Sequence, residues 1–347
     1  MTALTHAARA ARIVEVAERY FGRPVSSVSA PGGAGRSSLR LHFDRMDVIG
    51  TLRQDFRRTH LEAHVLRQLG ELSEDLPECI GVVDNVLFQS DVGKERLGQA
   101  MARSRPSGRL DLAARAVSAL FRLQSAARKT NLQTMMPHLG ANDEWVAGLV
   151  GCIRVLSPFG PIPTGFDRSA ACEAIAVAPS QFVKWDCRSG NAALNGLGRL
   201  RWFDFEYSGL RHGAEDFAWL IGDETLPVAP DQMVDVMIDC WDPGAGRDIG
   251  QYFEFLSIYL TFHAAQRLTL ILGELECRGW LDKEHILELD DAGVHPDFLV
   301  QICGVGRYFS EQTRLTAPLA PLFEAAGESF RKSEVAAGTS RTAPLAG

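Results

Sequence analysis

Short segments in which apolar and polar residues alternate fill the first ninety residues of the chain. Such alternation is typical of β-strands with one buried face, and it occurs at residues 25–30, 37–43, 47–53, 79–83 and 85–89. After the third segment, residues 57–70 carry apolar side chains at helical spacing and end on a glycine. The pattern predicts five short antiparallel strands with one helix inserted after the third.

Helical spacing dominates the rest of the chain. It is clearest at residues 110–126, 145–156 and 233–240 and in a long apolar stretch at 251–280. An amphipathic pattern at residues 5–22 predicts a further helix, which either packs on the small sheet or mediates association. From residue 332 the chain is rich in Ala, Ser, Thr and Gly, which predicts a disordered tail.

These patterns predict an α+β protein with two lobes and a tail. Residues 1–93 form an N-terminal lobe with the small antiparallel sheet and the leading helix. Residues 94–331 form a larger, mainly helical lobe, and residues 332–347 form the tail. A length of 347 residues, with 46% hydrophobic side chains, is sufficient for a substantial core in such an arrangement.

Composition and charge exclude several classes of partner. No stretch approaches the roughly 20 consecutive apolar residues that span a bilayer, and the N-terminus lacks the apolar block of a signal peptide. We therefore expect a cytoplasmic protein without a membrane partner. The net charge of −7 disfavours nucleic acid as the main partner. The seven cysteines are scattered and form no CxxC pair, which argues against a disulfide framework or a zinc site. The oligomeric state is not determined by these features.

Candidate chemistry is concentrated at residues 182–219. Apolar residues 182–183 lead to Asp186, and the apolar runs 192–194 and 200–203 flank an Asn-Gly turn and predict a hairpin. Pairing of these strands would place Asn191 near Asp204. Magnesium favours such hard oxygen ligands and usually takes its remaining ligands from phosphates and water. Asp and Asn also shape ordinary loops, but Asp204 ends a strand that is predicted to be buried, where a carboxylate needs a partner.

This arrangement resembles the active-site core of the aminoglycoside phosphotransferase and choline kinase family, which belongs to the protein-kinase-like superfamily. The family carries a His-Gly-Asp opening, Asn five residues after the Asp, and a later Asp-Phe-Glu. This chain carries Asp186, Asn191 and Asp204-Phe205-Glu206, with Lys184 in place of the histidine. The segment GAEDFAW at 213–219 is similar to the one that follows in the family, and its Asp216 is expected to cap a helix or brace the Asp186 loop.

The resemblance implies a bilobal protein-kinase-like fold and an ATP- and Mg²⁺-dependent phosphotransferase. Asp186 would act as the base toward a substrate hydroxyl, and Arg188 would contact the transferring phosphoryl group. Asn191 and Asp204 would hold Mg²⁺. The implied nucleotide contacts are the Gly-rich turn with its serines, a cationic residue with its helical partner, and the segment between the lobes, namely Gly33, Gly35, Ser37, Ser38, Arg53, Glu62, Gln89, Asp91 and Val92.

Two features bear on the acceptor and on activity. Residues 206–213 leave no room for the long segment on which protein kinases dock a peptide, so we expect a small hydroxylated acceptor, such as an aminoglycoside, a choline-like alcohol or a sugar. Acidic residues after the hairpin either attract a cationic acceptor or form a solvated surface, namely Asp223, Glu224, Asp231, Asp235, Asp239 and Asp242. Lys184 either pairs with Asp186 and lowers its basicity, contacts the phosphoryl group, or is a solvated charge.

Two alternatives remain open at this point. One is a nucleotide-binding protein that has lost catalysis, which Lys184 and the loosely matching Gly-rich turn would favour. The other is a metal-dependent hydrolase that uses Asp186, Asn191 and Asp204 without ATP. The first predicts metal-dependent ATP binding without ATP consumption, and the second predicts a metal site without a nucleotide cleft.

Overall fold

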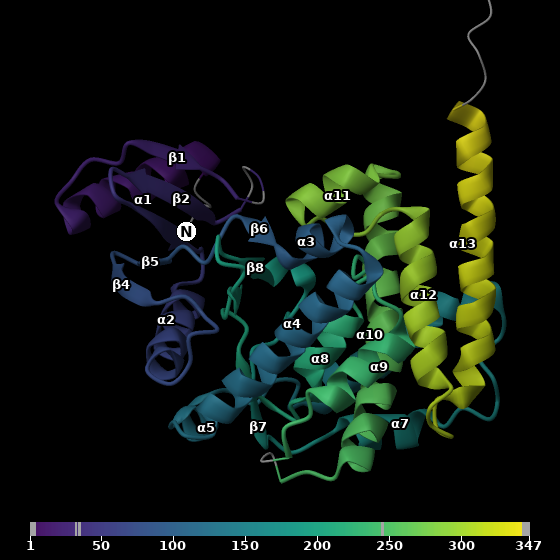
Figure 1. Cartoon of the computed structure of the whole chain (residues 1–347). Helices are drawn as coiled ribbons and strands as arrows, with labels where there is room; N and C mark the ends of the chain where they lie inside the picture. Colours follow the sequence, from purple (N-terminus) through teal and green to yellow (C-terminus); the bar gives the residue numbers. More distant parts are fainter. Residues whose placement is uncertain (1–4, 32, 34–35, 244–245, 342–347) are drawn as a thin grey trace, which may run out of the picture.

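The N-terminal part contains one antiparallel sheet. The computed structural model describes residues 5–31, 33, 36–243 and 246–341, with side chains as far as residue 332. The strands follow the order β1-β2-β3-β5-β4. They are β1 (Ser27–Ser29), β2 (Ser38–Phe43), β3 (Met46–Leu52), β4 (Cys79–Val83) and β5 (Val86–Ser90). Helix α2 (Phe56–Gly70) is inserted between β3 and β4, as the sequence predicts (Figure 1).

A two-residue turn at Asp84 and Asn85 joins β4 to β5. Both residues have positive φ, at 48° and 64°, which is the backbone that a tight two-residue hairpin requires and that Asp and Asn tolerate. The side chain of Asp84 is paired with Arg12, at 2.9 Å, and with Arg19. Both arginines lie on α1 (His6–Phe21), so the turn is tied to the leading helix.

The leading helix α1 packs on one face of the small sheet. Its buried Ile13 lies in a cluster with Leu41 and Phe88 from the strands. The approach is close at Gly50, where an added Cβ would lie 2.7 Å from a methyl group of Ile13. Successive strand residues point to opposite faces, so the neighbouring polar residues of β2 and β5 point away from α1 and toward the helical part.

The C-terminal part is mainly helical and encloses the larger core. Its helices are α3 (Leu97–Arg103), α4 (Pro106–Ala127), α5 (Leu132–Met135), α6 (Asp143–Gly151), η1 (Cys152–Phe159), α7 (Arg168–Ile175), η2 (Ser189–Asn191), α8 (Ala214–Ile221), α9 (Pro230–Asp239), α10 (Ile249–Arg278), α11 (Lys283–Leu289), α12 (Pro296–Ser310), η4 (Ala317–Leu319) and α13 (Ala320–Arg341). Two small sheets lie among them, with strands β6 (Glu95–Arg96), β7 (Gln181–Val183), β8 (Ala192–Leu194), β9 (Leu200–Trp202) and β10 (Gly209–Arg211).

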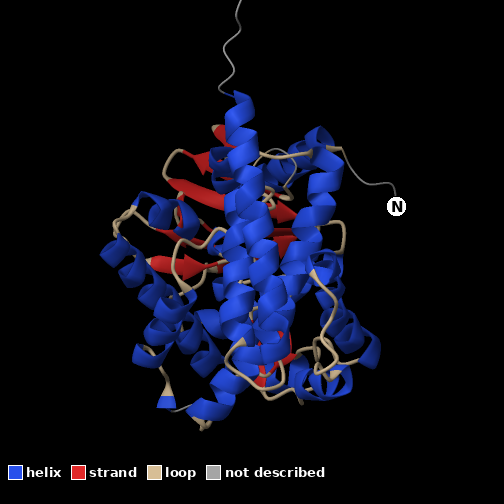
Figure 2. Cartoon of the chain, turned by 90° about the vertical axis from the view of Figure 1, so that its right-hand side faces the viewer, coloured by secondary structure: helices blue, strands red, loops and turns tan. Residues whose placement is uncertain are grey.

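Helix α10 runs through the centre of this part. Within the described residues it is the one helix whose length and composition would allow it to cross a membrane, but 78% of that apolar window is buried inside the protein. It therefore serves as a core helix. Helix α12 packs beside it and α13 packs on α12, on the side of the molecule away from the small sheet (Figures 1 and 2).

Two predictions differ from the structure. The segment 145–156 is not one helix, because α6 ends at Gly151 and a 3-10 helix that contains Pro158 follows. The tail predicted from residue 332 is helical as far as Arg341, where α13 ends. Ala, Glu, Lys and Arg are strong helix formers, so a segment poor in large apolar residues can still extend an existing helix. Residues 342–347 lie outside the described residues.

Candidate active site

Asp186 lies in a loop that follows the buried strand β7. Trp185 and Asp186 both have positive φ, at 62° and 43°, a backbone that bulky side chains seldom adopt. Asp216 on α8 holds this backbone in place: its carboxylate accepts hydrogen bonds from the amides of Lys184, at 3.1 Å, and Trp185, at 2.8 Å. Asp216 therefore braces the loop, which is one of the two roles expected for it.

Two side chains hold the carboxylate of Asp186. Asn191 donates from its amide nitrogen to Oδ2 at 3.0 Å, and Arg188 donates from Nε to Oδ1 at 2.9 Å. Burial alone would raise the pKa of Asp186, but the positive charges of Arg188 and Lys184 outweigh it, and the pKa lies below its ordinary value. The group is therefore ionised at neutral pH and able to accept a proton.

The predicted hairpin brings Asn191 and Asp204 to neighbouring positions. β8 pairs with β9, with Ala192 opposite Trp202, and the amide of Phe203 donates to the carbonyl of Asn191 at 2.9 Å. Asn191 uses its amide nitrogen toward Asp186, so its amide oxygen is not engaged by that residue. The two candidate metal ligands thus lie at one end of the hairpin.

Lys184 connects this hairpin to the Asp186 loop through hydrogen bonds to the backbone of both. Its side chain is 1% exposed. The ammonium group donates to the backbone carbonyl of Asp204 at 3.0 Å and lies 3.4 Å from the carbonyl of Asp186. Its hydrogen bonds are therefore to backbone oxygens and not to the carboxylate of Asp186. The interpretation of Lys184 as a solvated charge is wrong, because the residue is buried.

Arg53 is the centre of a buried cluster of charges. It forms ion pairs with Glu62 on α2 at 2.6 Å, with Asp204 at 2.9 Å and with Glu206 at 2.8 Å. Burial opposes the charge of Arg53, but the three carboxylates raise its pKa above the ordinary value. The amide of Phe205 donates to Glu62 at 3.0 Å. Helix α2 is thereby tied to both the small sheet and the hairpin.

A cavity of about 180 Å³ lies between the small sheet and the hairpin. Most of the residues that the sequence assigns to nucleotide and metal line it, namely Ser37, Ser38, Arg53, Glu62, Gln89, Asp91, Val92, Asn191 and Asp204. Gly33 lines a neighbouring cavity together with Asp186 and Arg188. Gly35 lies outside the described residues.

Some of these side chains are already engaged within the protein. The hydroxyl of Ser38 lies 2.8 Å from that of Thr51, and Asp91 accepts hydrogen bonds from Arg40 at 2.7 and 3.0 Å. Gln89 differs, because its buried Oε1 atom has no hydrogen-bond partner in the described part of the chain. A buried acceptor of this kind is costly unless a ligand satisfies it.

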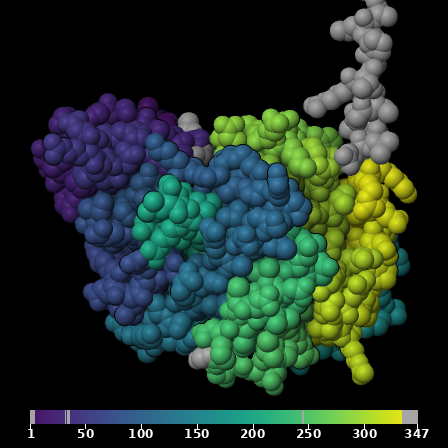
Figure 3. Space-filling view, in the orientation of Figure 1, coloured from purple at the N-terminus to yellow at the C-terminus, as the bar shows by residue number. Residues whose placement is uncertain are grey.

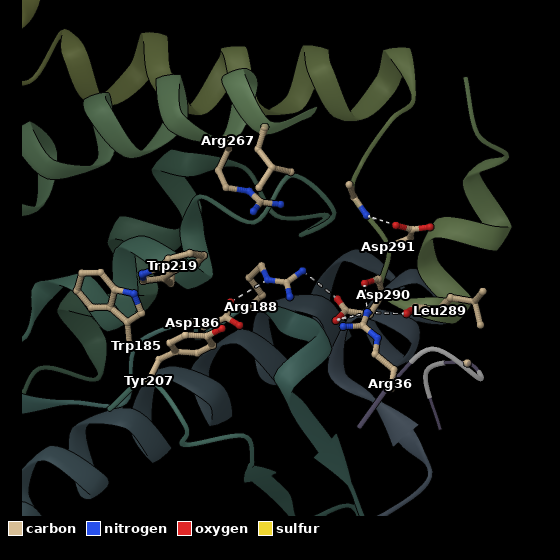
Figure 4. A pocket seen from close by; sticks show the side chains of 13 residues that line it. Arg36, Trp185, Asp186, Arg188, Tyr207, Trp219, Arg267, Leu289, Asp290 and Asp291 are labelled. Atoms are coloured by element: carbon tan, nitrogen blue, oxygen red, sulfur yellow. Dashed lines mark hydrogen bonds and ion pairs between the residues drawn. The ribbon is translucent and has the colours of Figure 1, made fainter. Parts of the chain in front are cut away.

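The neighbouring cavity is larger, at about 740 Å³. Figure 4 shows Asp186 and Arg188 at its centre, with Trp185, Tyr207 and Trp219 on one side. Asp290 lies on the other side and lines both cavities. The candidate base and the candidate metal ligands therefore face adjoining spaces of different size.

Sequence reasoning missed Asp290 and two of the arginines around it, Arg36 and Arg96. Its carboxylate lies 3.3 Å from both Arg96 and Arg188 and 3.7 Å from Arg36. Asp290 follows α11, about a hundred residues after the hairpin, and no local pattern marks it. Arg40 was missed as well, although a charged residue among the apolar positions of β2 is a recognisable signal.

The acidic residues after the hairpin do not line the larger cavity. Asp223 accepts a hydrogen bond from the amide of Ser189, and Glu224 forms a buried ion pair with Arg267 at 2.7 Å. The remaining four lie on or beside α9: Asp231, Asp235 and Asp239 are exposed, and Asp242 pairs with Arg128. They give no reason to expect a cationic acceptor.

Comparison with known proteins supports the fold. No protein-family model and no curated protein matches the sequence. Among solved structures, the GDP complex of wild-type aminoglycoside 2'-phosphotransferase-IIIa has a TM-score of 0.53 at 12% identity, over 92% of this chain and 99% of that one. The gentamicin complex of APH(2'')-IIa has a TM-score of 0.53 at 14% identity, with the same coverage. The apoenzyme of macrolide 2'-phosphotransferase MphH from Brachybacterium faecium has a TM-score of 0.51 at 13% identity, over 79% and 94% of the two chains.

Proposed function

We propose that this chain, which has the protein-kinase-like fold of the aminoglycoside phosphotransferases, transfers the γ-phosphoryl group of ATP to a hydroxyl of a small molecule. The observation that carries the proposal is the placement of Asp186. Its carboxylate faces the larger cavity, while Asn191, which orients it, lines the smaller one. Phosphoryl transfer needs such a junction, because an acceptor hydroxyl and a nucleotide must meet in line.

The chain's own residues supply the parts of this reaction. The ionised carboxylate of Asp186 takes the proton of the attacking hydroxyl. Asn191 and Arg188 fix its orientation through bonds of 3.0 and 2.9 Å. Arg188, which lines the same cavity, offsets negative charge that develops on the phosphoryl group.

The smaller cavity fits a nucleotide in two respects. Gln89 presents an unpartnered buried oxygen that an N–H group of the base would satisfy. Arg53, held by Glu62 at 2.6 Å, carries a fixed positive charge at the edge where phosphates would lie. The backbone of residues 89–92 would contact the base edge, and the turn with Gly33, Gly35, Ser37 and Ser38 would cover the phosphates.

The hairpin end fits a magnesium ion. Asp204 and Asn191 offer hard oxygen donors to the same cavity, and Mg²⁺ is commonly held by one or two such groups together with phosphate oxygens. A bound Mg²⁺ would neutralise charge on the phosphates. Lys184 leaves this set intact, because it bonds to backbone carbonyls beneath the hairpin.

A thermal-shift series tests this proposal against the two alternatives. Mg²⁺ with ATP is expected to raise the melting temperature, since a ligand that binds only the folded state stabilises it. Mg²⁺ alone, or ATP with a chelator, is expected to give a smaller shift, and Asp204→Asn is expected to reduce the shift with Mg²⁺ and ATP. An equal shift with Mg²⁺ alone would favour the metal hydrolase. A full shift without ATP consumption over any small alcohol would favour the non-catalytic homologue.

A further inference from the structure

The larger cavity has an aromatic wall beside Asp186. Trp185, Tyr207 and Trp219 line it from the Asp186 loop, the segment before β10 and helix α8 (Figure 4). The ring of Trp185 lies between those of Trp145 and Trp219, at centroid distances of 6.1 and 6.0 Å. The two tryptophans of the wall are therefore packed against neighbouring rings, and Tyr207 lies against the guanidinium of Arg58, 4.3 Å from its ring centroid.

Trp185 has a backbone conformation that bulky side chains seldom adopt. Its φ of 62° lies in the left-handed region, where glycine is free of strain and a bulky side chain is not. Burial of the side chain does not fully offset this backbone strain, because Trp185 is only partly buried and its ring borders the cavity. Strain kept at a cavity wall points to a function of the side chain itself.

The carboxylates of the cavity are already matched by arginines. Asp186 pairs with Arg188 at 2.9 Å, Asp290 pairs with Arg188 and Arg96 at 3.3 Å, and Asp291 bonds to Arg278 at 2.9 Å. Arg36, Arg188 and Arg267 line the same space. A polycationic ligand would meet these arginines and would have to displace existing ion pairs.

We infer that the acceptor is an uncharged hydroxylated compound with a flat ring, and that Trp185 is its specificity-determining residue through stacking on that ring. This inference rests on the proposed phosphotransfer, because that proposal makes the larger cavity the acceptor site. Aromatic side chains favour ring faces through apolar contact and the geometry of their π-systems. An uncharged ring leaves every ion pair of the cavity in place.

Binding measurements with three probes test the inference without requiring catalysis. The probes are phenyl glucoside, which is uncharged, phenyl glucosaminide, which carries an amine in place of one hydroxyl of the same scaffold, and kanamycin, which is a polycation. By titration calorimetry, the wild-type protein is expected to bind phenyl glucoside more tightly than phenyl glucosaminide and to bind kanamycin most weakly. Tighter binding of kanamycin, or no binding of phenyl glucoside, would overturn the inference.

Two variants assign the effect to Trp185. Trp185→Gly is expected to weaken binding of phenyl glucoside about tenfold, while Trp185→Phe keeps most of the affinity. Trp185→Gly is also expected to keep the thermal shift with Mg²⁺ and ATP, which shows that it folds. Wild-type affinity for phenyl glucoside in Trp185→Gly would contradict the assignment, and the ranking of probes on the wild type needs no variant.

The inference and the proposed function fail in different ways. If phenyl glucoside binds through Trp185 but ATP is not consumed with any alcohol, the phosphotransfer is wrong, and what stands is only that the larger cavity binds uncharged ring compounds. If ATP is consumed with kanamycin and not with uncharged ring compounds, the phosphotransfer stands and the inferred acceptor class is wrong.

Discussion

Lys184 is a buried cation whose ammonium group faces backbone oxygens. The rings of Phe205 and Trp202 lie 5.2 and 5.8 Å from it, and aromatic faces stabilise a cation at such distances. The carbonyls that it contacts belong to Trp185, Asp186 and Asp204. Lys184 thus joins the loop with the candidate base to the hairpin end with a candidate metal ligand.

Replacing Lys184 by methionine should separate these two loops. Lys184→Met leaves three carbonyls without their donor, and hydrogen bonds to charged groups contribute about 2 kcal/mol. We expect a loss of that order in the free energy of unfolding, measured by urea denaturation, and a lower kcat. Lys184→His, which introduces the histidine found at this position in the family that the sequence resembles, should keep more activity than Lys184→Met. Unchanged stability in Lys184→Met would contradict the bracing role.

At the scale of single residues, the sequence predicts the site residues that belong to a local sequence pattern. Asp186, Asn191 and Asp204 are close in the chain and around one hairpin, and their proximity follows from strand pairing. Asp290 joins the same site only through the path of α10 and α11. Its contacts depend on tertiary packing, and no spacing in the sequence encodes them.

Helix α10 carries a buried histidine at the back of the larger cavity wall. His263 is fully buried, and its ring lies 4.6 Å from that of Trp219 between centroids. Burial lowers its pKa to about 3, because a protonated ring would lose its hydration, and the charge of Arg267 acts in the same direction. The folded protein therefore keeps this histidine neutral.

This histidine should make stability depend on pH. Histidine in the unfolded chain titrates near pH 6.5, so between that pH and about 3 the unfolded state binds a proton that the folded state does not. The free energy of unfolding should then fall as pH falls through this window, by up to about 1.4 kcal/mol per pH unit. Urea denaturation at several pH values measures the slope. His263→Gln should flatten it, whereas His60→Gln, at an exposed position on α2, should not. An equal slope in His263→Gln would contradict the assignment.

Elements with a strong period were predictable, and short or irregular ones were not. β4 occupies the predicted residues 79–83, and α10 nearly fills the predicted stretch 251–280. β6 is two residues long and β10 is three, so neither shows an alternation. α11 is held by packing against α3, and its seven residues are too few for a distinct apolar stripe.

The two parts of the molecule are joined across the smaller cavity. Asp290 is 11% exposed in its side chain and receives arginines from both parts: Arg36 from before β2, Arg96 from before α3 and Arg188 from the Asp186 loop. Arg36 also donates to the carbonyls of Leu289 and Asp290 at 3.2 and 2.8 Å. Figure 3 shows the purple N-terminal part close to the yellow-green region that contains α11. The smaller cavity measures about 180 Å³, below the roughly 300–1,000 Å³ that is common for ligand sites. Entry of the proposed nucleotide would therefore require the contacts of Arg36 to loosen.

Asp290→Asn should weaken this junction. The substitution keeps the shape of the side chain but removes the countercharge of Arg96 and leaves Arg188 with Asp186 as its partner. Removing one partner of a buried ion pair costs about 3 kcal/mol. We expect a loss of that order in the free energy of unfolding, measured by urea denaturation. Asp239→Asn, at an exposed position on α9, is the control and should have little effect. Wild-type stability in Asp290→Asn would show that the junction contributes nothing.

The transfer of labelled phosphate from γ-labelled ATP to a small alcohol tests the central claim most directly. Wild-type protein with Mg²⁺ is expected to label a hydroxylated acceptor. Asp186→Asn is expected to lose at least about a hundredfold in rate while keeping the thermal shift with Mg²⁺ and ATP. Full transfer by Asp186→Asn, or no transfer by the wild type to any acceptor, would contradict the account.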